Sequence, residues 1–164
     1  MATSSLDRFR QAQDQRFAGF VAALDEIRSG GKRGHWIWYV FPQIEGLGMS
    51  GMAKAYGIRG VGEAREYLLD PELGARLITM TEAVAAQARG GVSLTTLMGS
   101  EIDVLKLVSS LTLFGHVARQ LQAEEGREVL GRMADLAEEL LAIAAAEGQP
   151  PCRFTLARLQ ESYP

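Results

Sequence analysis

The residues best suited to chemistry lie in segment 32–43, KRGHWIWYVFPQ, which holds both tryptophans of the chain. His35 is a candidate acid or base, because an imidazole titrates near neutral pH. The rings of Trp36 and Tyr39 can stack on a planar ligand, and the amide of Gln43 can donate and accept hydrogen bonds. Basic residues that can meet phosphate or carboxylate groups adjoin these rings: Arg28, Lys32 and Arg33. The segment therefore predicts contacts with an anionic ligand that contains a ring.

The same aromatic residues can also be explained as hydrophobic core. A single helix cannot place four neighbouring large rings on one face, so the segment must be surrounded either by protein or by ligand. Aromatic side chains dominate the energetics of protein cores, and His35 can simply hydrogen-bond a backbone carbonyl. The sequence leaves both interpretations open.

A second group of polar residues lies in segment 100–114, SEIDVLKLVSSLTLF, which is otherwise apolar on nearly all sides of a helix. Asp103, Lys106 and Ser110 recur at i, i+3 and i+7 and therefore share one side of that helix. A lysine in such surroundings must reach water or be paired. One interpretation is a pocket lining to which Ser109 also belongs, with Lys106 neutralising an anion and Asp103 orienting it. The alternative is a helix cap at residue 100 with a weak ion pair between Asp103 and Lys106.

A third candidate is the glycine-rich segment 46–52, GLGMSGM. Backbone N–H groups at the start of a helix can bind an anion. The spacing does not match a phosphate-binding loop, which requires Gly-Lys followed by Ser or Thr. The preferred interpretation is a tight loop in which Ser50 caps a short helix over residues 51–56.

Other chemistries find little support in the sequence. The only histidines are His35 and His116, and the single cysteine, Cys152, lies far along the chain beside prolines. We therefore expect no metal site and no cofactor. The sequence also lacks a Gly-x-Ser-x-Gly elbow and a His-Glu-x-x-His motif.

Hydrophobic residues recur at helical spacing along most of the chain, which predicts an all-α fold with central buried helices. The aromatic run 36–41 is predicted to be a buried helix that ends before Pro42. Strand signals are thin, and we expect one compact multihelical domain over residues 1–164, with frayed ends at 1–5 and 160–164. The other predicted helices are one long or two short helices up to residue 28, a helix that starts at Asp70-Pro71-Glu72 and ends near 90, and helices over 100–120 and 128–147.

Composition limits the classes of partner. The chain has 164 residues, 47% of them hydrophobic, and a formal charge of −3. Residues 1–60 carry 8 basic and 5 acidic side chains, which gives +3, and the remainder carries −6. The overall charge predicts no nucleic-acid polymer or membrane as partner. With a lone cysteine and no signal-like start, we expect a cytoplasmic protein. The oligomeric state is left open.

The motifs together resemble a known family. Segment 35–43, HWIWYVFPQ, is followed by Gly46-Leu47-Gly48, and the pattern closes on Asp103, Lys106-Leu107 and Ser109-Ser110. This pattern is similar to the uncharacterised family catalogued as domain of unknown function 1810, and it covers most of residues 6–116. The resemblance implies a multihelical all-α domain and no established activity. The end of the chain departs from the family, because 148–154 replaces a short Gly-x-x-Asp segment.

Two functional hypotheses follow. In the first, segments 35–43 and 100–110 form a pocket for an anionic, ring-containing small molecule, such as a nucleotide or an ADP-ribose derivative. Whether the chain is an enzyme stays open; if it is, His35 or Asp103 would serve as acid or base, and Lys106 would stabilise negative charge. In the second, the aromatic motif is purely structural, and the chain is a protein-interaction module without catalytic activity. The two differ in whether these segments meet around a solvent-accessible cavity.

Overall fold

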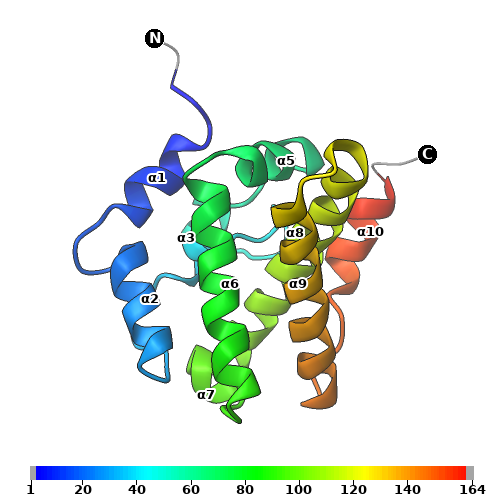
Figure 1. Cartoon of the computed structure of the whole chain (residues 1–164). Coiled ribbons are helices and arrows are strands. Elements are labelled where there is room, and N and C mark those ends of the chain that lie inside the picture. Colours follow the sequence, from blue (N-terminus) through cyan, green and yellow to red (C-terminus); the bar gives the residue numbers. More distant parts are fainter. Residues whose placement is uncertain (1–2, 162–164) are drawn as a thin grey trace.

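The computed structural model describes residues 3–161, and these form ten helices without a strand (Figure 1). The all-α prediction is confirmed. The helices are α1 (Asp7–Gln13), α2 (Phe20–Arg28), α3 (Ile37–Val40), α4 (Gly51–Ala55), α5 (Val61–Leu69), α6 (Leu73–Arg89), α7 (Leu94–Met98), α8 (Glu101–Glu125), α9 (Glu128–Ala146) and α10 (Arg153–Glu161). No helix in residues 3–161 is both long and apolar enough to cross a membrane.

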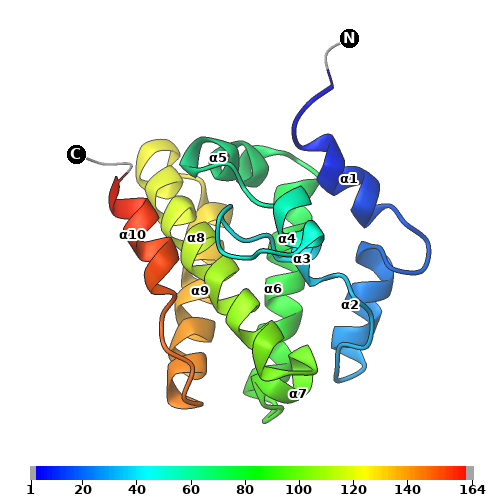
Figure 2. The ribbon, with the colours of Figure 1, turned by 180° about the vertical axis from the view of Figure 1, so that it is seen from behind.

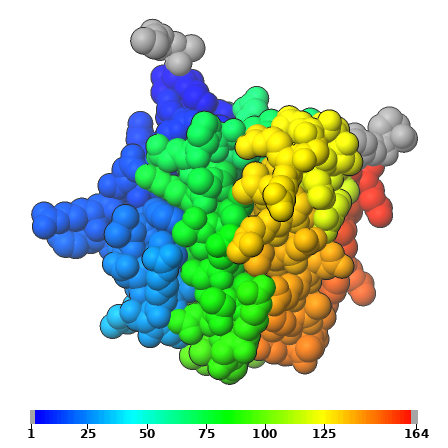
Figure 3. Space-filling view, in the orientation of Figure 1, coloured from blue at the N-terminus to red at the C-terminus, as the bar shows by residue number. Residues whose placement is uncertain are grey.

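Helix α8 is the centre of the fold. It packs most extensively against α9 and also contacts α5, α7, α10 and α3. Figures 1 and 2 show α1 and α2 at one edge of the molecule and α10 at the opposite edge. On the face of Figure 3, the surface of α6 joins that of α2 on one side and that of α9 on the other. The expectation that α8 is buried nearly all round is correct for its middle, where Val108 and Leu113 are buried along with the stripe from Val104 to Phe114. It is wrong for the first turns, where Ile102 and Leu105 are exposed.

Local capping signals place the starts of several helices. The Oγ of Ser50 accepts a hydrogen bond from Ala53 N at 3.1 Å, which confirms the predicted cap of α4. The carboxylate of Asp70 accepts from the backbone N–H groups of Glu72 and Leu73. The helix itself begins at Leu73, two residues later than predicted, and Pro71 lies in the preceding turn. Helix α8 also runs five residues beyond the predicted end at residue 120, to a glycine at position 126 with φ of 65°.

The N-terminal end of the chain matches one of the two predicted alternatives, whereas the C-terminal end differs from expectation. The N-terminal pattern forms two short helices, and the connecting loop exposes 85% of Phe17. After the prolines at 150 and 151 the chain continues into α10, which the sequence analysis does not predict; its buried side chains are Thr155 and Leu159. Of the predicted frayed ends, residues 1–2 and 162–164 lie outside the described residues, whereas Gln160 and Glu161 belong to α10.

The aromatic segment lies in the core. Trp36 and Phe41 are fully buried, and Tyr39 is 3% exposed. The ring of Phe9 from α1 meets that of Tyr67 edge-on at 5.2 Å. After α3, Ile44 forms an isolated parallel β-bridge with Ile58. The predicted buried helix is therefore confirmed, with the shorter extent Ile37–Val40.

Candidate functional site

The two segments singled out in the sequence meet at a cluster of three charged side chains. The Nζ of Lys32 lies 2.7 Å from Oδ2 of Asp103, and the Nζ of Lys106 lies 3.2 Å from Oδ1 of the same carboxylate. Their side chains are 6%, 15% and 23% exposed for Lys32, Asp103 and Lys106. Two cations thus share one anion in a largely buried place, and one positive charge is left over. We call these three residues the lysine cluster.

Each lysine also lies over an indole ring. The Nζ of Lys106 is 4.6 Å from the ring centroid of Trp38, and that of Lys32 is 5.3 Å from the ring of Trp36. Both distances allow cation–π attraction. Burial alone would raise the pKa of Asp103, but hydrogen bonds and charge from Lys32, and then from Lys106, hold this pKa below its ordinary value. Asp103 is therefore an ionised acceptor for both lysines at neutral pH.

The backbone on either side fixes the position of Lys32. Its N–H donates to the carbonyl of Leu97 in α7 at 2.7 Å. Gly99, between α7 and α8, has φ of 85°, and a Cβ there would lie 3.2 Å from the carbonyl oxygen of Lys32. The glycine thus permits both the left-handed turn and the close approach of the two backbones. Ser100 then starts α8 by accepting a hydrogen bond from Asp103 N.

The other predicted residues of the aromatic segment face in different directions. Trp36 donates its indole N–H to the carboxylate of Glu26, and the hydroxyl of Tyr39 donates to the carbonyl of Ala18. Both rings are buried in the core, so neither offers a free face to a ligand. His35 is exposed to solvent on the loop between α2 and α3.

A small cavity lies beside the aromatic segment. It has a volume of about 10 Å³ and is lined by residues that include Trp38, Gln43, Leu47 and Tyr56. That volume corresponds to about one water molecule and excludes a ring. Segments 32–43 and 100–110 therefore meet at the lysine cluster, where Lys106 also lies over Trp38.

The two predicted serines are both buried on α8. Ser109 donates its hydroxyl to the carbonyl of Leu105 at 2.9 Å. The Oγ of Ser110 is the one buried side-chain polar atom in residues 3–161 without a hydrogen-bond partner. An unpaired buried hydroxyl costs about 1–3 kcal/mol. Ser110 lies one turn beyond Lys106 on the same side of the helix.

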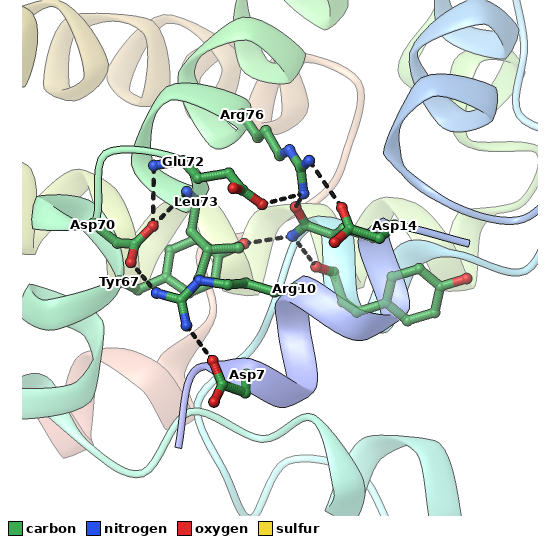
Figure 4. A network of polar contacts seen from close by, with 10 residues as sticks. Asp7, Arg10, Asp14, Tyr67, Asp70, Glu72, Leu73 and Arg76 are labelled. Carbon is green, nitrogen blue, oxygen red and sulfur yellow. Dashed lines mark hydrogen bonds and ion pairs between the residues drawn. The ribbon is translucent and has the colours of Figure 1, made fainter. Parts of the chain in front are cut away.

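A larger polar network lies away from the cluster, between α1 and α6 (Figure 4). Arg10 bridges Asp7 and Asp70, and Arg76 pairs with Asp14 at 3.0 Å and with Glu72. Beneath them the buried amide of Gln13 donates to the carbonyl of Tyr39 at 2.8 Å and to the hydroxyl of Tyr67 at 2.9 Å. Burial raises the pKa of Tyr67, so its phenol stays protonated. This network holds α1 onto the aromatic segment. In residues 3–161 no group of three or more His, Cys, Asp or Glu side chains is placed to hold a metal ion.

Only part of this geometry can be predicted from the sequence. The pairing of Asp103 with Lys106 is local and is predicted from their spacing. Lys32 is recognised as a basic neighbour of the rings but not as a partner of Asp103, because the two lie far apart in the sequence. Glu26 is missed entirely, since nothing in the spacing of α2 distinguishes it from Asp25.

Comparison with known proteins places these observations in a family. The profile of the family described as protein of unknown function (DUF1810) matches residues 3–140. The chain belongs to this family. The match confirms the resemblance carried by segments 35–43 and 100–114, and both parts of the lysine cluster lie within the matched residues. Membership itself brings no activity.

The fold also has a solved counterpart. The chain is similar to the conserved hypothetical protein Rv1873 from Mycobacterium tuberculosis, whose crystal structure at 1.38 Å superposes with a TM-score of 0.69. The two sequences are 35% identical, and the similarity covers 93% of this chain and 94% of that one. None of the curated proteins matches the chain.

Proposed function

We propose that this protein binds a small molecule through an anionic group, such as a phosphate, at the lysine cluster. The supporting observation is the sharing of one carboxylate by two lysines. An ammonium group has three N–H donors, and each lysine gives one contact to Asp103. Donors and one net positive charge are left to meet an incoming anion. The predicted roles of Lys106 and Asp103 fit this arrangement, and Lys32 joins them.

The choice of lysine at this place supports the proposal. The chain has three lysines among its 17 basic residues, and two of the three are in the cluster. In the other ion pairs within residues 3–161 the cation is an arginine. Arginine suits a planar, two-point pairing with a carboxylate, whereas lysine acts on phosphate as a compact point charge.

A ring on the ligand would find one aromatic partner, and it is neither of the two that the sequence suggests. The rings of Trp36 and Tyr39 are buried, and Trp38 is half-buried with Lys106 over it. Trp38 is therefore the aromatic residue that we assign to ligand contact. The exposed His35 is the second residue that we assign to it. A catalytic role for His35, Asp103 or Lys106, and a ligand contact by Gln43, stay predictions.

The test is a titration with three probes: inorganic phosphate, AMP and ADP-ribose, each followed by isothermal titration calorimetry. We expect Lys106→Met and Lys32→Met each to weaken binding by about tenfold or more, since each removes one charge from the anion's surroundings. Lys54→Met is the matched control, because it removes the remaining lysine of the chain, which is exposed on α4. Circular dichroism melts would establish that all three variants fold.

The proposal fails if none of the probes binds the wild-type protein, or if Lys54→Met weakens binding as much as the cluster variants do. Absence of binding by all three probes would favour the second candidate, a protein-interaction module in which the aromatic segment is structural. The burial of Trp36, Tyr39 and Phe41 is the observation in its favour.

A further inference from the structure

The loop that carries Lys32 is wrapped around a carboxylate from the preceding helix. Glu26 of α2 accepts hydrogen bonds from the backbone N–H of Gly34 at 2.6 Å and from the indole N–H of Trp36 at 3.1 Å. It also accepts from the backbone N–H of Arg33 at 3.2 Å. Three donors from one short loop therefore converge on one carboxylate, in the manner of a bound anion. We call these three N–H groups the Glu26 cradle.

Gly34 permits this close approach. A Cβ at position 34 would lie 3.0 Å from Oε1 of Glu26 and 3.0 Å from Cδ1 of Trp36. Both contacts are tighter than a side chain normally tolerates, so any larger residue would push the carboxylate or the indole away. The glycine between the basic and aromatic halves of the segment thus has a packing reason, which the sequence alone does not reveal.

The cradle adjoins Lys32 of the lysine cluster in two ways. Lys32 directly precedes Arg33 in the loop, and its ammonium group lies over the ring of Trp36, whose indole N–H donates to Glu26. On its other side Lys32 is tied to Leu97. The backbone of Lys32 is thus held on both sides, at a place from which its ammonium group reaches Asp103 at 2.7 Å.

We infer that Glu26 is a positioning residue for the proposed anion site: it holds the 32–36 loop so that Lys32 reaches Asp103, without touching the ligand itself. This inference rests on the proposed function. It makes a prediction whose sign is opposite to that of simple electrostatics. Removing a negative charge near an anion site should strengthen anion binding, whereas releasing the loop should weaken it.

The experiment compares Glu26→Ala, Glu26→Gln and the control Asp25→Ala, titrated with inorganic phosphate by calorimetry. Asp25 is exposed on the same helix and carries the same charge. We expect Glu26→Ala to weaken phosphate binding by about fivefold or more, and Asp25→Ala to leave it unchanged. Glu26→Gln keeps one acceptor oxygen and should lie between the two. Added formate, which can occupy the emptied cradle, should restore part of the affinity of Glu26→Ala.

A second readout keeps the inference separate from the proposed function. In a Trp38→Phe background, Trp36 is the remaining tryptophan, and its emission reports directly on the bond to Glu26. Formate should return the emission of the Glu26→Ala variant toward that of the parent, whether or not phosphate binds. If wild type binds phosphate and Glu26→Ala binds it equally well or better, the positioning role is overturned while the proposed function stands. If wild type binds AMP or ADP-ribose but not phosphate, the same comparison is made with that probe. If wild type binds none of the three, the proposed function fails, and a formate-insensitive Trp36 emission would reject the cradle as well.

Discussion

At the scale of single residues, a largely buried ion pair joins two helices that are distant in the sequence. Arg8 of α1 donates to Glu63 of α5 through both terminal nitrogens, at 2.6 and 3.1 Å, and also to the carbonyl of Gly57 at 2.8 Å. Glu63 in turn accepts from the backbone of Arg59. Burial alone would raise the pKa of Glu63, but the hydrogen bond from Arg8, with the further bonds and charge, holds it below its ordinary value. The pair ties α1 to the start of α5.

Breaking this pair should destabilise the protein and remove part of its acid sensitivity. We expect Glu63→Gln to lower the free energy of unfolding at pH 7 by about 2–3 kcal/mol, because Arg8 then stays partly buried without its anion. Since the folded-state pKa of Glu63 lies below the ordinary value of 4.5, the stabilisation is complete above about that pH and is lost as pH falls through the folded value. Urea denaturation between pH 7 and pH 3 measures both effects. A variant with the wild-type pH dependence would contradict the assignment.

Ser110 is the opposite case, because its buried hydroxyl has no hydrogen-bond partner. Replacing it with alanine removes an unpaired buried hydroxyl, so Ser110→Ala should raise the free energy of unfolding by about 1 kcal/mol. Ser109→Ala is the control on the adjacent position, where the hydroxyl is already paired with Leu105, and it should be neutral or slightly destabilising. Thermal melts of both variants measure the two changes in stability. A destabilised Ser110→Ala would mean that its hydroxyl has a partner after all.

Among the helices, the contact of α8 with α9 is set by a glycine. A Cβ on Gly115 would lie 2.8 Å from the Cβ of Ala137, so the two helices touch almost backbone to backbone at this point. The Cβ of alanine is fixed directly to the backbone, so an added methyl group could be accommodated only by moving the two helices apart. This contact joins the central helix to its most extensive partner.

Gly115→Ala should therefore lower the free energy of unfolding by about 1–3 kcal/mol, as overpacking does in cores. The same substitution at Gly62, an exposed position in α5 where an added Cβ meets nothing within 4 Å, should stabilise the protein by about 0.5–1 kcal/mol. Urea denaturation of the two variants gives the comparison. Equal effects would show that helix propensity, not helix packing, governs position 115.

Helices with local signals are the ones that the sequence predicts well. Ser50 and Asp70 cap the helices that follow them, because a cap is a contact between residues two or three positions apart. Helix α10 escapes prediction because its apolar face is short, with only Thr155 and Leu159 buried, and because two prolines precede it. Its helical form depends on packing against α8, which periodicity alone does not report.

For the molecule as a whole, the local features of the candidate site could be predicted from the sequence, whereas the contacts between distant segments could not. The aromatic segment and the polar side of α8 are visible in the sequence, and they do come together. The small size of the cavity beside the aromatic segment depends on how closely its lining residues Trp38, Leu47 and Tyr56 lie, which the spacing of residues in the sequence does not encode. The partnership of Lys32 with Asp103 likewise requires the turn at Gly99.

The exposed connection between α1 and α2 has a consequence for limited proteolysis. Arg16 and Phe17 are exposed there and suit trypsin and chymotrypsin, whereas α1 itself is held by Arg8, Arg10 and Arg76 and by the buried ring of Phe9. We expect a single cut at this loop to leave the N-terminal peptide bound, so that the nicked protein elutes from a gel-filtration column as one particle and separates in denaturant. Loss of the peptide under native conditions would show that chain continuity, not the arginine contacts, retains α1. The nicked molecule would thus consist of two fragments held together without a peptide bond, and the N-terminal fragment would still contribute the buried ring of Phe9 to the core.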